Sequence, residues 1–174
     1  MVSNQLDIVM AQWAKLGIWF GSETACNSPD LENLLLDTAK LVPSNARLFY
    51  TCVSWLSQYG NLVEANRLKS LTEKRLATEH QPALAAILAL AVKHGAPDDL
   101  LIVAETCHPS KTIRPLFDVH QQSKTLSGIA KTNACEECLK WNLWVQDQPP
   151  KLDVLRPMTW IIEQNPSFQA RMKG

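Results

Sequence analysis

One stretch limits the fold of this chain more than any other: PALAAILALAVKHG, from Pro82 to Gly95. Leucine, isoleucine and valine recur in it at helical spacing, and alanines fill most of the positions between them. A helix that is apolar on every side must be covered on every side, and the small alanine side chain lets neighbouring helices come close. We therefore expect this stretch to be the central helix of a helical domain.

Capping residues divide much of the remaining chain into further helices. Ser3 or Asn4 is placed to cap a first helix, and Ser28, followed by Pro29, is placed to cap a second. Ser44 is expected to cap the next one. Apolar residues at helical spacing predict one helix over residues 45–59 and another over residues 62–74. They also predict a helix that begins at Pro97 and a further one that begins at Pro157.

Two segments complete the prediction of an all-α fold. Asn133 and Glu136 have the spacing of a capping box, which predicts a helix running through Cys138 to Trp144. The apolar run at 100–103 fits the helix after Pro97 and is also compatible with a short strand. We expect about eight helices in a single helical domain over residues 1–174.

The spacing of two glycines leaves two arrangements of these helices open. Gly60 and Gly95 lie 35 residues apart, and each ends an apolar helix that a less apolar helix follows. This period resembles stacked α-hairpins, as in helical repeat proteins, although no tetratricopeptide or ankyrin signature occurs. The alternative is an irregular helical bundle.

Charge and hydropathy narrow the possible partners. The 174 residues carry 17 Lys and Arg against 17 Asp and Glu, so bulk charge gives no argument for binding nucleic acid or an anionic membrane. The longest apolar run, Ala83 to Val92, is about half the ~20 residues that span a bilayer. Five cysteines make an odd count, and no signal-peptide pattern opens the chain. We expect a reduced cytoplasmic protein without a membrane partner.

The motif Cys135-Glu-Glu-Cys138 is the strongest candidate for a chemical site. Two cysteines three residues apart lie on one face of a helix, and their thiolates are zinc ligands. Tetrahedral zinc needs two more ligands, for which Cys107 and His120 are the candidates. They lie outside any second metal-binding spacing, so we expect core cysteines and no metal or cofactor. A thioredoxin-like role is disfavoured because no βαβ pattern surrounds the motif.

Enzyme motifs are otherwise weak. Arg75 and His80 have the R-x4-H spacing of HEPN ribonucleases, a helical class that this short segment resembles. That resemblance implies an RNA-cleaving pair, but Leu76 replaces the usual polar residue and Pro82 interrupts the helix. The chain contains no phosphate-binding loop, nucleophile elbow or HExxH motif.

Two basic regions are the predicted interaction surface. The irregular segment 106–124 contains Lys111, Arg114 and His120, and Ile113, Leu116, Phe117 and Val119 are expected to anchor it to the helices. The second region is a strip on the predicted helix 62–74 and just after it, formed by Arg67, Lys69, Lys74 and Arg75.

These observations favour a non-catalytic, intracellular, regulatory or protein-interaction role. The six tryptophans support it, because tryptophan is enriched at interface hot spots. The alternative is a nucleic-acid-binding regulator, such as the antitoxin-like component of a two-gene module. A helix–turn–helix centred on Gly95 would present acidic residues to phosphates, and one centred on Gly60 would pack badly. A zinc-dependent or HEPN-like enzyme is the third possibility. No pattern indicates an oligomeric state.

Overall fold

The computed structural model describes residues 2–20 and 28–173 and confirms the all-α prediction. Cys26 lies outside the described residues. Within these described ranges, eight α-helices have seven residues or more: α1 (Val2–Lys15), α2 (Leu31–Leu41), α3 (Ala46–Tyr59), α4 (Ala65–Arg75), α5 (Gln81–Lys93), α6 (Asp99–Glu105), α8 (Lys124–Thr132) and α10 (Met158–Gln164). Two helices are single turns: α7 (Asp118–Gln121) and α9 (Glu136–Leu139). Short 3-10 helices complete the set: η1 (Val42–Ser44), η2 (Gly60–Leu62), η3 (Leu152–Val154) and η4 (Pro166–Lys173).

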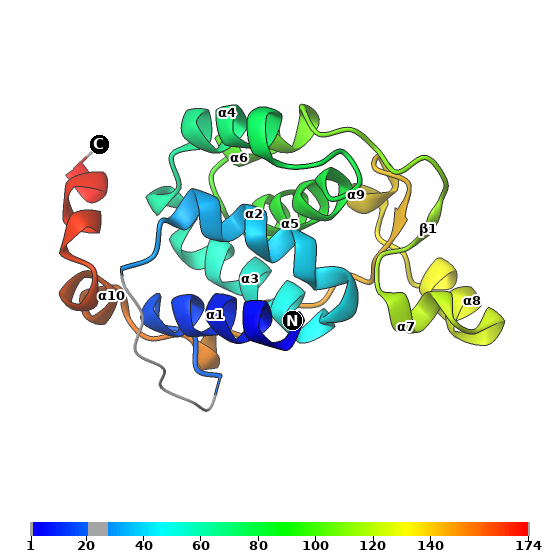
Figure 1. Ribbon diagram of the computed structural model, residues 1–174, viewed down its shortest axis with the longest axis horizontal. Helices are drawn as coiled ribbons and strands as arrows, with labels where there is room; N and C mark the ends of the chain where they lie inside the picture. Colours follow the sequence, from blue (N-terminus) through cyan, green and yellow to red (C-terminus); the bar gives the residue numbers. More distant parts are fainter. Residues whose placement is uncertain (1, 21–27, 174) are drawn as a thin grey trace.

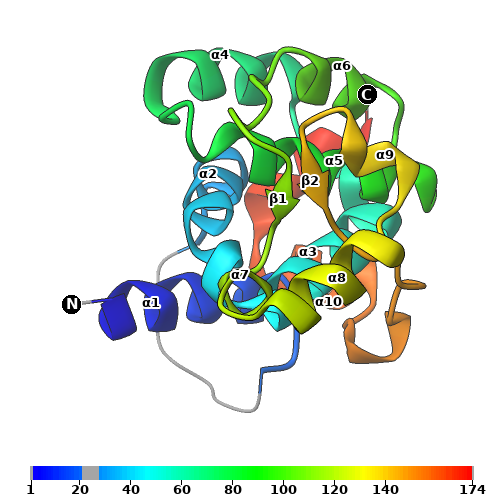
Figure 2. The same ribbon diagram turned by 90° about the vertical axis from the view of Figure 1, so that its right-hand side faces the viewer.

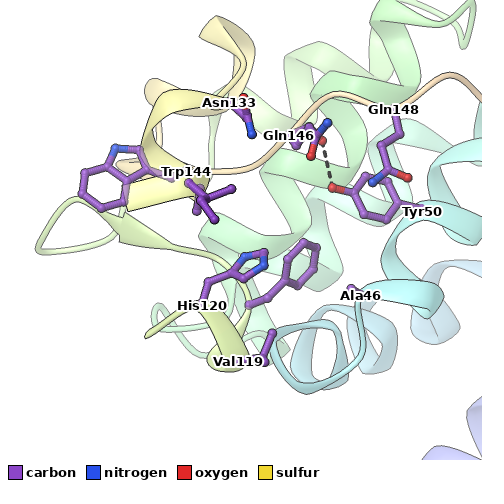
Figure 3. Close-up of a pocket in the computed structure, with 11 residues that line it drawn as sticks. Ala46, Tyr50, Val119, His120, Asn133, Trp144, Gln146 and Gln148 are labelled. Carbon is purple, nitrogen blue, oxygen red and sulfur yellow. Dashed lines mark hydrogen bonds between the residues drawn. The ribbon is translucent and has the colours of Figure 1, made fainter. Parts of the chain in front are cut away.

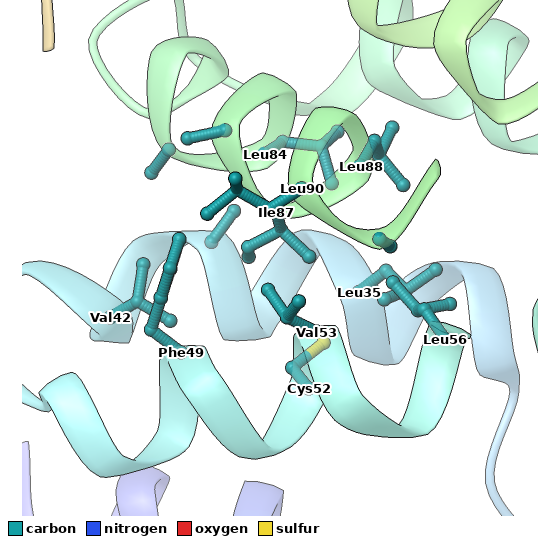
Figure 4. Close-up of a cluster of buried hydrophobic side chains, with 14 of the residues drawn as sticks. Leu35, Val42, Phe49, Cys52, Val53, Leu56, Leu84, Ile87, Leu88 and Leu90 are labelled. Carbon is teal, nitrogen blue, oxygen red and sulfur yellow. The ribbon is translucent and has the colours of Figure 1, made fainter. Parts of the chain in front are cut away.

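Helix α5 occupies the middle of the molecule, as its composition predicts (Figure 1). Every residue from Gln81 to Ala91 is buried. The helix packs against α6, α3, α2 and α9, so its alanines meet neighbours in several directions. Figure 4 shows Ile87 and Leu90 facing the apolar side chains of α2 and α3, among them Leu35 and Val53.

The packing combines features of both predicted arrangements. Helix α3 packs on α5 and α4 packs on α6, as in two stacked hairpins. However, α2 packs on both α4 and α5, and α9 also covers α5. The described chain is therefore an irregular bundle around α5 that contains one stacked pair.

Three predicted helix starts were wrong by a few residues. Helix α1 begins at Val2, so Ser3 and Asn4 lie within it. Asp30, rather than Ser28, caps α2, because its extended backbone lets its carboxylate accept from the Asn33 amide. In the same way, Asn45, rather than Ser44, caps α3. In both cases the capping side chain lies directly before the first helical residue.

The region after α6 differs most from the prediction. The run at 100–103 is helical within α6, and the strands lie elsewhere: β1 (Arg114–Pro115) pairs in parallel with β2 (Leu143–Trp144). The predicted helix through Trp144 was wrong, because α9 ends at Leu139 and Asn142 has a φ of 58°, which turns the chain into β2. Helix α8 was not predicted.

These elements gather at one end of the molecule. Figure 2 faces that end and shows β1 and β2 above α7 and α8, with α9 beside them. Helix α10 and the C-terminal segment lie at the opposite end (Figure 1). The strands, α7 and α8 thus form a small, loop-rich unit against the ends of the long helices.

Candidate ligand-binding surface

A hollow of about 270 Å³ opens where this loop-rich unit meets α3. We call it the aromatic hollow. Its walls come from segments about a hundred residues apart in the sequence, and the side chains that line it are Ala46, Tyr50, Phe117, Val119, His120, Ile129, Ala130, Asn133, Trp144, Gln146 and Gln148 (Figure 3).

Aromatic packing forms one side of the hollow. Phe117 is buried, and its ring lies 5.5 Å from that of Phe49 and 5.8 Å from that of Tyr50, in edge and tilted contacts. Its backbone follows Leu116, whose amide donates to the Trp144 carbonyl at 3.3 Å. The burial of the Phe117 ring and the backbone hydrogen bond between Leu116 and Trp144 therefore fix the position of this wall together.

A hydrogen bond holds the wall opposite α7 in place. The Tyr50 hydroxyl donates to the Gln146 carbonyl at 2.9 Å, which ties α3 to the segment after β2 (Figure 3). Burial raises the pKa of Tyr50, and the neighbouring Cys135, Cys138 and Asp147 add to the shift. The phenol therefore keeps its proton and remains a donor at neutral pH.

The polar side chains of the aromatic hollow are amides and an imidazole. Asn133, Gln146 and Gln148 each offer a donor and an acceptor, and His120 lies against the Phe117 ring with centroids 5.9 Å apart. Of the residues that the structure describes, neither a carboxylate nor a lysine lines this hollow. The lining is suited to a ligand with apolar parts and neutral amide-like groups.

A second, more open hollow of about 350 Å³ adjoins the first across Trp144, and we call it the lysine hollow. It is lined by Gln121, Ser123, Lys124, Ser127, Gly128, Lys131 and Trp144. The Lys131 ammonium lies 5.7 Å from the centre of the Trp144 ring, a cation–π contact. Two lysines without a lining carboxylate make this hollow locally basic in a chain of zero net charge.

The structure separates the residues of the predicted ledge at 106–124. His120 lines the aromatic hollow, whereas Lys111 is exposed and Arg114 lies in β1 with its amide donating to Asn142. The expected anchoring is confirmed for two of the four apolar residues. Leu116 and Phe117 are buried, whereas Ile113 and Val119 are more than half exposed.

The predicted basic strip is largely engaged within the fold. Arg67 pairs with Asp30 and with the buried Glu32, and Arg75 donates to Asn33 at 2.6 Å. The hydrogen bond from Arg67 lowers the pKa of Asp30 to about 2. Lys74 is exposed and Lys69 is half-buried. Of the strip, mainly the two lysines remain to meet a partner.

The candidate zinc ligands are not brought together. Among the described residues, no group of three or more His, Cys, Asp or Glu side chains is placed to share a metal ion. Cys135 and Cys138 are both buried and lie one helical turn apart at the start of α9. His120 faces the aromatic hollow, and Cys107 is buried at the end of α6, where burial raises its pKa to about 12.

The HEPN-like pair is also divided. Arg75 is the last residue of α4, whereas His80 lies in the turn before α5, 3.4 Å from the Glu79 carboxylate. The helix that follows Gly95, α6, begins with Asp99 and exposes Ile102.

Sequence reasoning missed most of the lining of both hollows. Phe117 was predicted only as an anchor of the segment 106–124, Trp144 was predicted within a helix, and Tyr50 was assigned no role. Lys124 and Lys131 gave no signal because helix α8 was not predicted. Their helical spacing of seven residues could have placed both lysines on one face of α8.

Within the described part of the chain, no helix combines the length and apolar character needed to cross a membrane. No known protein-family model, curated protein or solved structure matches the chain.

Proposed function

We propose that the protein is a non-catalytic binding protein that takes up a segment of another protein in the aromatic hollow. The observation that carries this proposal is the lining itself: aromatic rings, three amide side chains and one imidazole, with no carboxylate, lysine or arginine among the described lining residues. Among the described lining residues, no carboxylate, thiol or lysine accompanies the His120 imidazole, whereas the rings and amides complement an apolar side chain and the backbone that carries it.

The size of the aromatic hollow favours one side chain of a partner over a complete cofactor. Its volume of about 270 Å³ is at the lower edge of the ~300–1,000 Å³ of small-molecule sites. At its rim, Val119 and Ile129 are half exposed, and they add apolar area around the opening. An aromatic or large aliphatic side chain is therefore the expected anchor.

The polar groups define what surrounds that anchor. Asn133, Gln146 and Gln148 can each donate to a peptide carbonyl and accept from a peptide N–H. Lys124 and Lys131, in the adjoining lysine hollow, favour an acidic residue a short distance along the partner segment. The expected ligand is an extended peptide with one large apolar residue and a nearby aspartate or glutamate.

Labelled synthetic peptides test this proposal directly. One peptide series carries a central tryptophan or leucine with flanking aspartates, and a matched series carries flanking lysines. We expect the acidic series to bind more tightly, as measured by fluorescence anisotropy. Ile129→Glu should weaken binding by about tenfold or more, because it places a charge at the apolar rim.

Ile102→Glu is the matched control, because Ile102 is 60% exposed on α6, compared with 50% for Ile129 on α8. It should leave binding unchanged. Replacing Lys124 and Lys131 together by glutamate should reverse the preference between the two peptide series. Equal losses in the Ile102 and Ile129 variants, or no binding of any peptide, would contradict the proposal.

A second candidate, single-stranded nucleic acid, is favoured by one observation: Lys131 lies over the Trp144 ring. Bases stack on aromatic side chains while lysines contact phosphates, so the two hollows together offer both kinds of contact. Binding of an oligothymidylate should then weaken steeply with salt. Replacing Lys124 and Lys131 by glutamine should reduce the slope by about 1.4.

A further inference from the structure

The chain places two buried cysteines one helical turn apart at the start of α9, beside the aromatic hollow. Cys135 is the N-cap of α9 and Cys138 is its third residue, so one helical turn brings their side chains to the same face. Residues at this spacing meet the Cα separation of ~4.4–6.8 Å that a disulfide requires.

The two thiols differ in ways that assign them different chemical roles. Cys135 is 8% exposed, whereas Cys138 is completely covered. The hydrogen bond from Cys138 lowers the pKa of Cys135 against the opposing effect of burial. Donating that bond, together with burial, raises the pKa of Cys138. Cys135 is therefore the attacking thiolate, and Cys138 is the thiol that completes the disulfide.

A compact ion cluster lies next to this pair. The Lys93 ammonium is 2.9 Å from a Glu137 oxygen and 2.9 Å from an Asp147 oxygen, and His94 Nε2 is 2.7 Å from the other Asp147 oxygen. The carboxylates of Glu137 and Asp147 oppose formation of a thiolate at Cys135. Lys93 pairs with both carboxylates, so its charge offsets part of this opposition.

The remaining described cysteines provide a contrast. Cys52 and Cys107 are buried, and burial is what raises the pKa of each. Cys107 lies just after α6, and its thiol donates to the carbonyl of Val103 in that helix at 3.7 Å. Cys107 is thus a core residue of comparable exposure without the features of an attacking thiol, and it serves as the matched control.

We propose that Cys135 and Cys138 form a reversible dithiol–disulfide couple, which a small disulfide such as oxidised glutathione oxidises. The Cys135 thiolate attacks one sulfur of the small disulfide, which breaks the S–S bond and releases one glutathione thiol. Cys138 then loses its proton and attacks the Cys135 sulfur, which releases the second glutathione thiol. The two protein thiols lose two electrons and two protons, and the small disulfide gains them.

The couple is a local redox site rather than the centre of a thioredoxin-like enzyme. The parallel strands β1 and β2 on either side of the motif are only two residues long each, and the attacking sulfur is nearly covered. These features suit slow equilibration with a small oxidant better than rapid exchange with a protein substrate. This inference does not depend on which ligand the aromatic hollow binds.

Equilibration in glutathione buffers of increasing oxidised fraction tests the proposal. The folded protein is trapped with acid and a thiol-alkylating reagent, and mass spectrometry of the peptides locates any disulfide. We expect the Cys135–Cys138 disulfide to become the major form in the most oxidising buffer and to disappear again in reduced glutathione. Circular dichroism of the same samples should show retained helix throughout.

Single substitutions separate the two roles. Cys138→Ser should accumulate a mixed disulfide between Cys135 and glutathione, because no second thiol can release it. Cys135→Ser should give neither product, and Cys107→Ser should keep the wild-type transition. Free thiols at both positions in the most oxidising buffer would overturn the proposal, and so would a disulfide that forms only when the helical signal is lost.

Discussion

Removing the charge of Glu32 should destabilise the fold more than any change at a surface carboxylate. Glu32 is 0% exposed on α2, and a glutamate side chain is almost never fully buried unless it is paired. Its Oε1 accepts from the Glu64 amide at 2.9 Å and from Arg171 Nη1 at 2.8 Å, and its Oε2 pairs with Arg67. One side chain therefore joins α2, α4 and the C-terminal segment η4.

The expected loss in the free energy of unfolding for Glu32→Gln follows from these contacts. Glutamine keeps the shape and one acceptor, but its NH₂ group replaces one oxygen and meets the N–H donors of Arg67 or Arg171. Two charge-assisted hydrogen bonds weaken, each worth about 1.5–3 kcal/mol. Both arginines retain other partners, namely Asp30 for Arg67 and the Leu62 carbonyl for Arg171, and this limits the loss.

We expect a loss of about 3 kcal/mol in the free energy of unfolding, within the range for breaking a buried ion pair. For a domain of this size, it corresponds to a fall of about 6–12 °C in the melting temperature. Urea unfolding followed by tryptophan fluorescence measures it, since Trp13 and Trp55 are completely buried.

Glu64→Gln is the matched control, because the Glu64 side chain is 54% exposed and contacts Arg171 at 3.3 Å. Its exposed ion pair should contribute less than about 1 kcal/mol. A loss below about 1 kcal/mol for Glu32→Gln, or equal losses for both variants, would refute the reasoning that burial makes this charge network important.

Three further predictions concern the core and the pH dependence of stability. Leu88→Asp should abolish soluble folding, since it buries an unpaired charge in α5, whereas Leu88→Ala should cost about 2–5 kcal/mol and remain folded by circular dichroism. Thr38→Val should cost about 1–3 kcal/mol in urea unfolding, because the buried indole N–H of Trp13 loses its acceptor at 2.8 Å; Thr38→Ser, which keeps the hydroxyl, should cost less. The pKa of Asp30 is lowered to about 2 by its hydrogen bond with Arg67, so its stabilisation is present above about pH 4 and is lost as the pH falls toward 2. Asp30→Asn should remove that part of the acid dependence, as measured by unfolding at about pH 6 and about pH 3, and an unchanged dependence would contradict the assignment.

The sequence by itself determined the central helix and the fold class. The burial of α5 could be predicted because the spacing of Leu84, Ile87 and Leu88, with alanines between them, leaves no polar face to meet water. The closeness of Cys135 and Cys138 could be predicted as well, since residues three apart are neighbours in any helical turn. Such features depend on interactions between residues a few positions apart, so the spacing of residue types along the sequence is enough to predict them.

The tertiary structure alone decided the candidate binding surface. Tyr50 and Gln146 line the same hollow because α3 and the segment after β2 pack together across 96 residues of chain. The predicted helix through Trp144 stops at Leu139 because Leu143 and Trp144 pair with β1 instead. This pairing joins residues far apart in the chain, so no local sequence pattern indicates it. Likewise, Arg67 was predicted at a surface but pairs with Asp30 and the buried Glu32, because a charge finds its partners in space rather than along the chain.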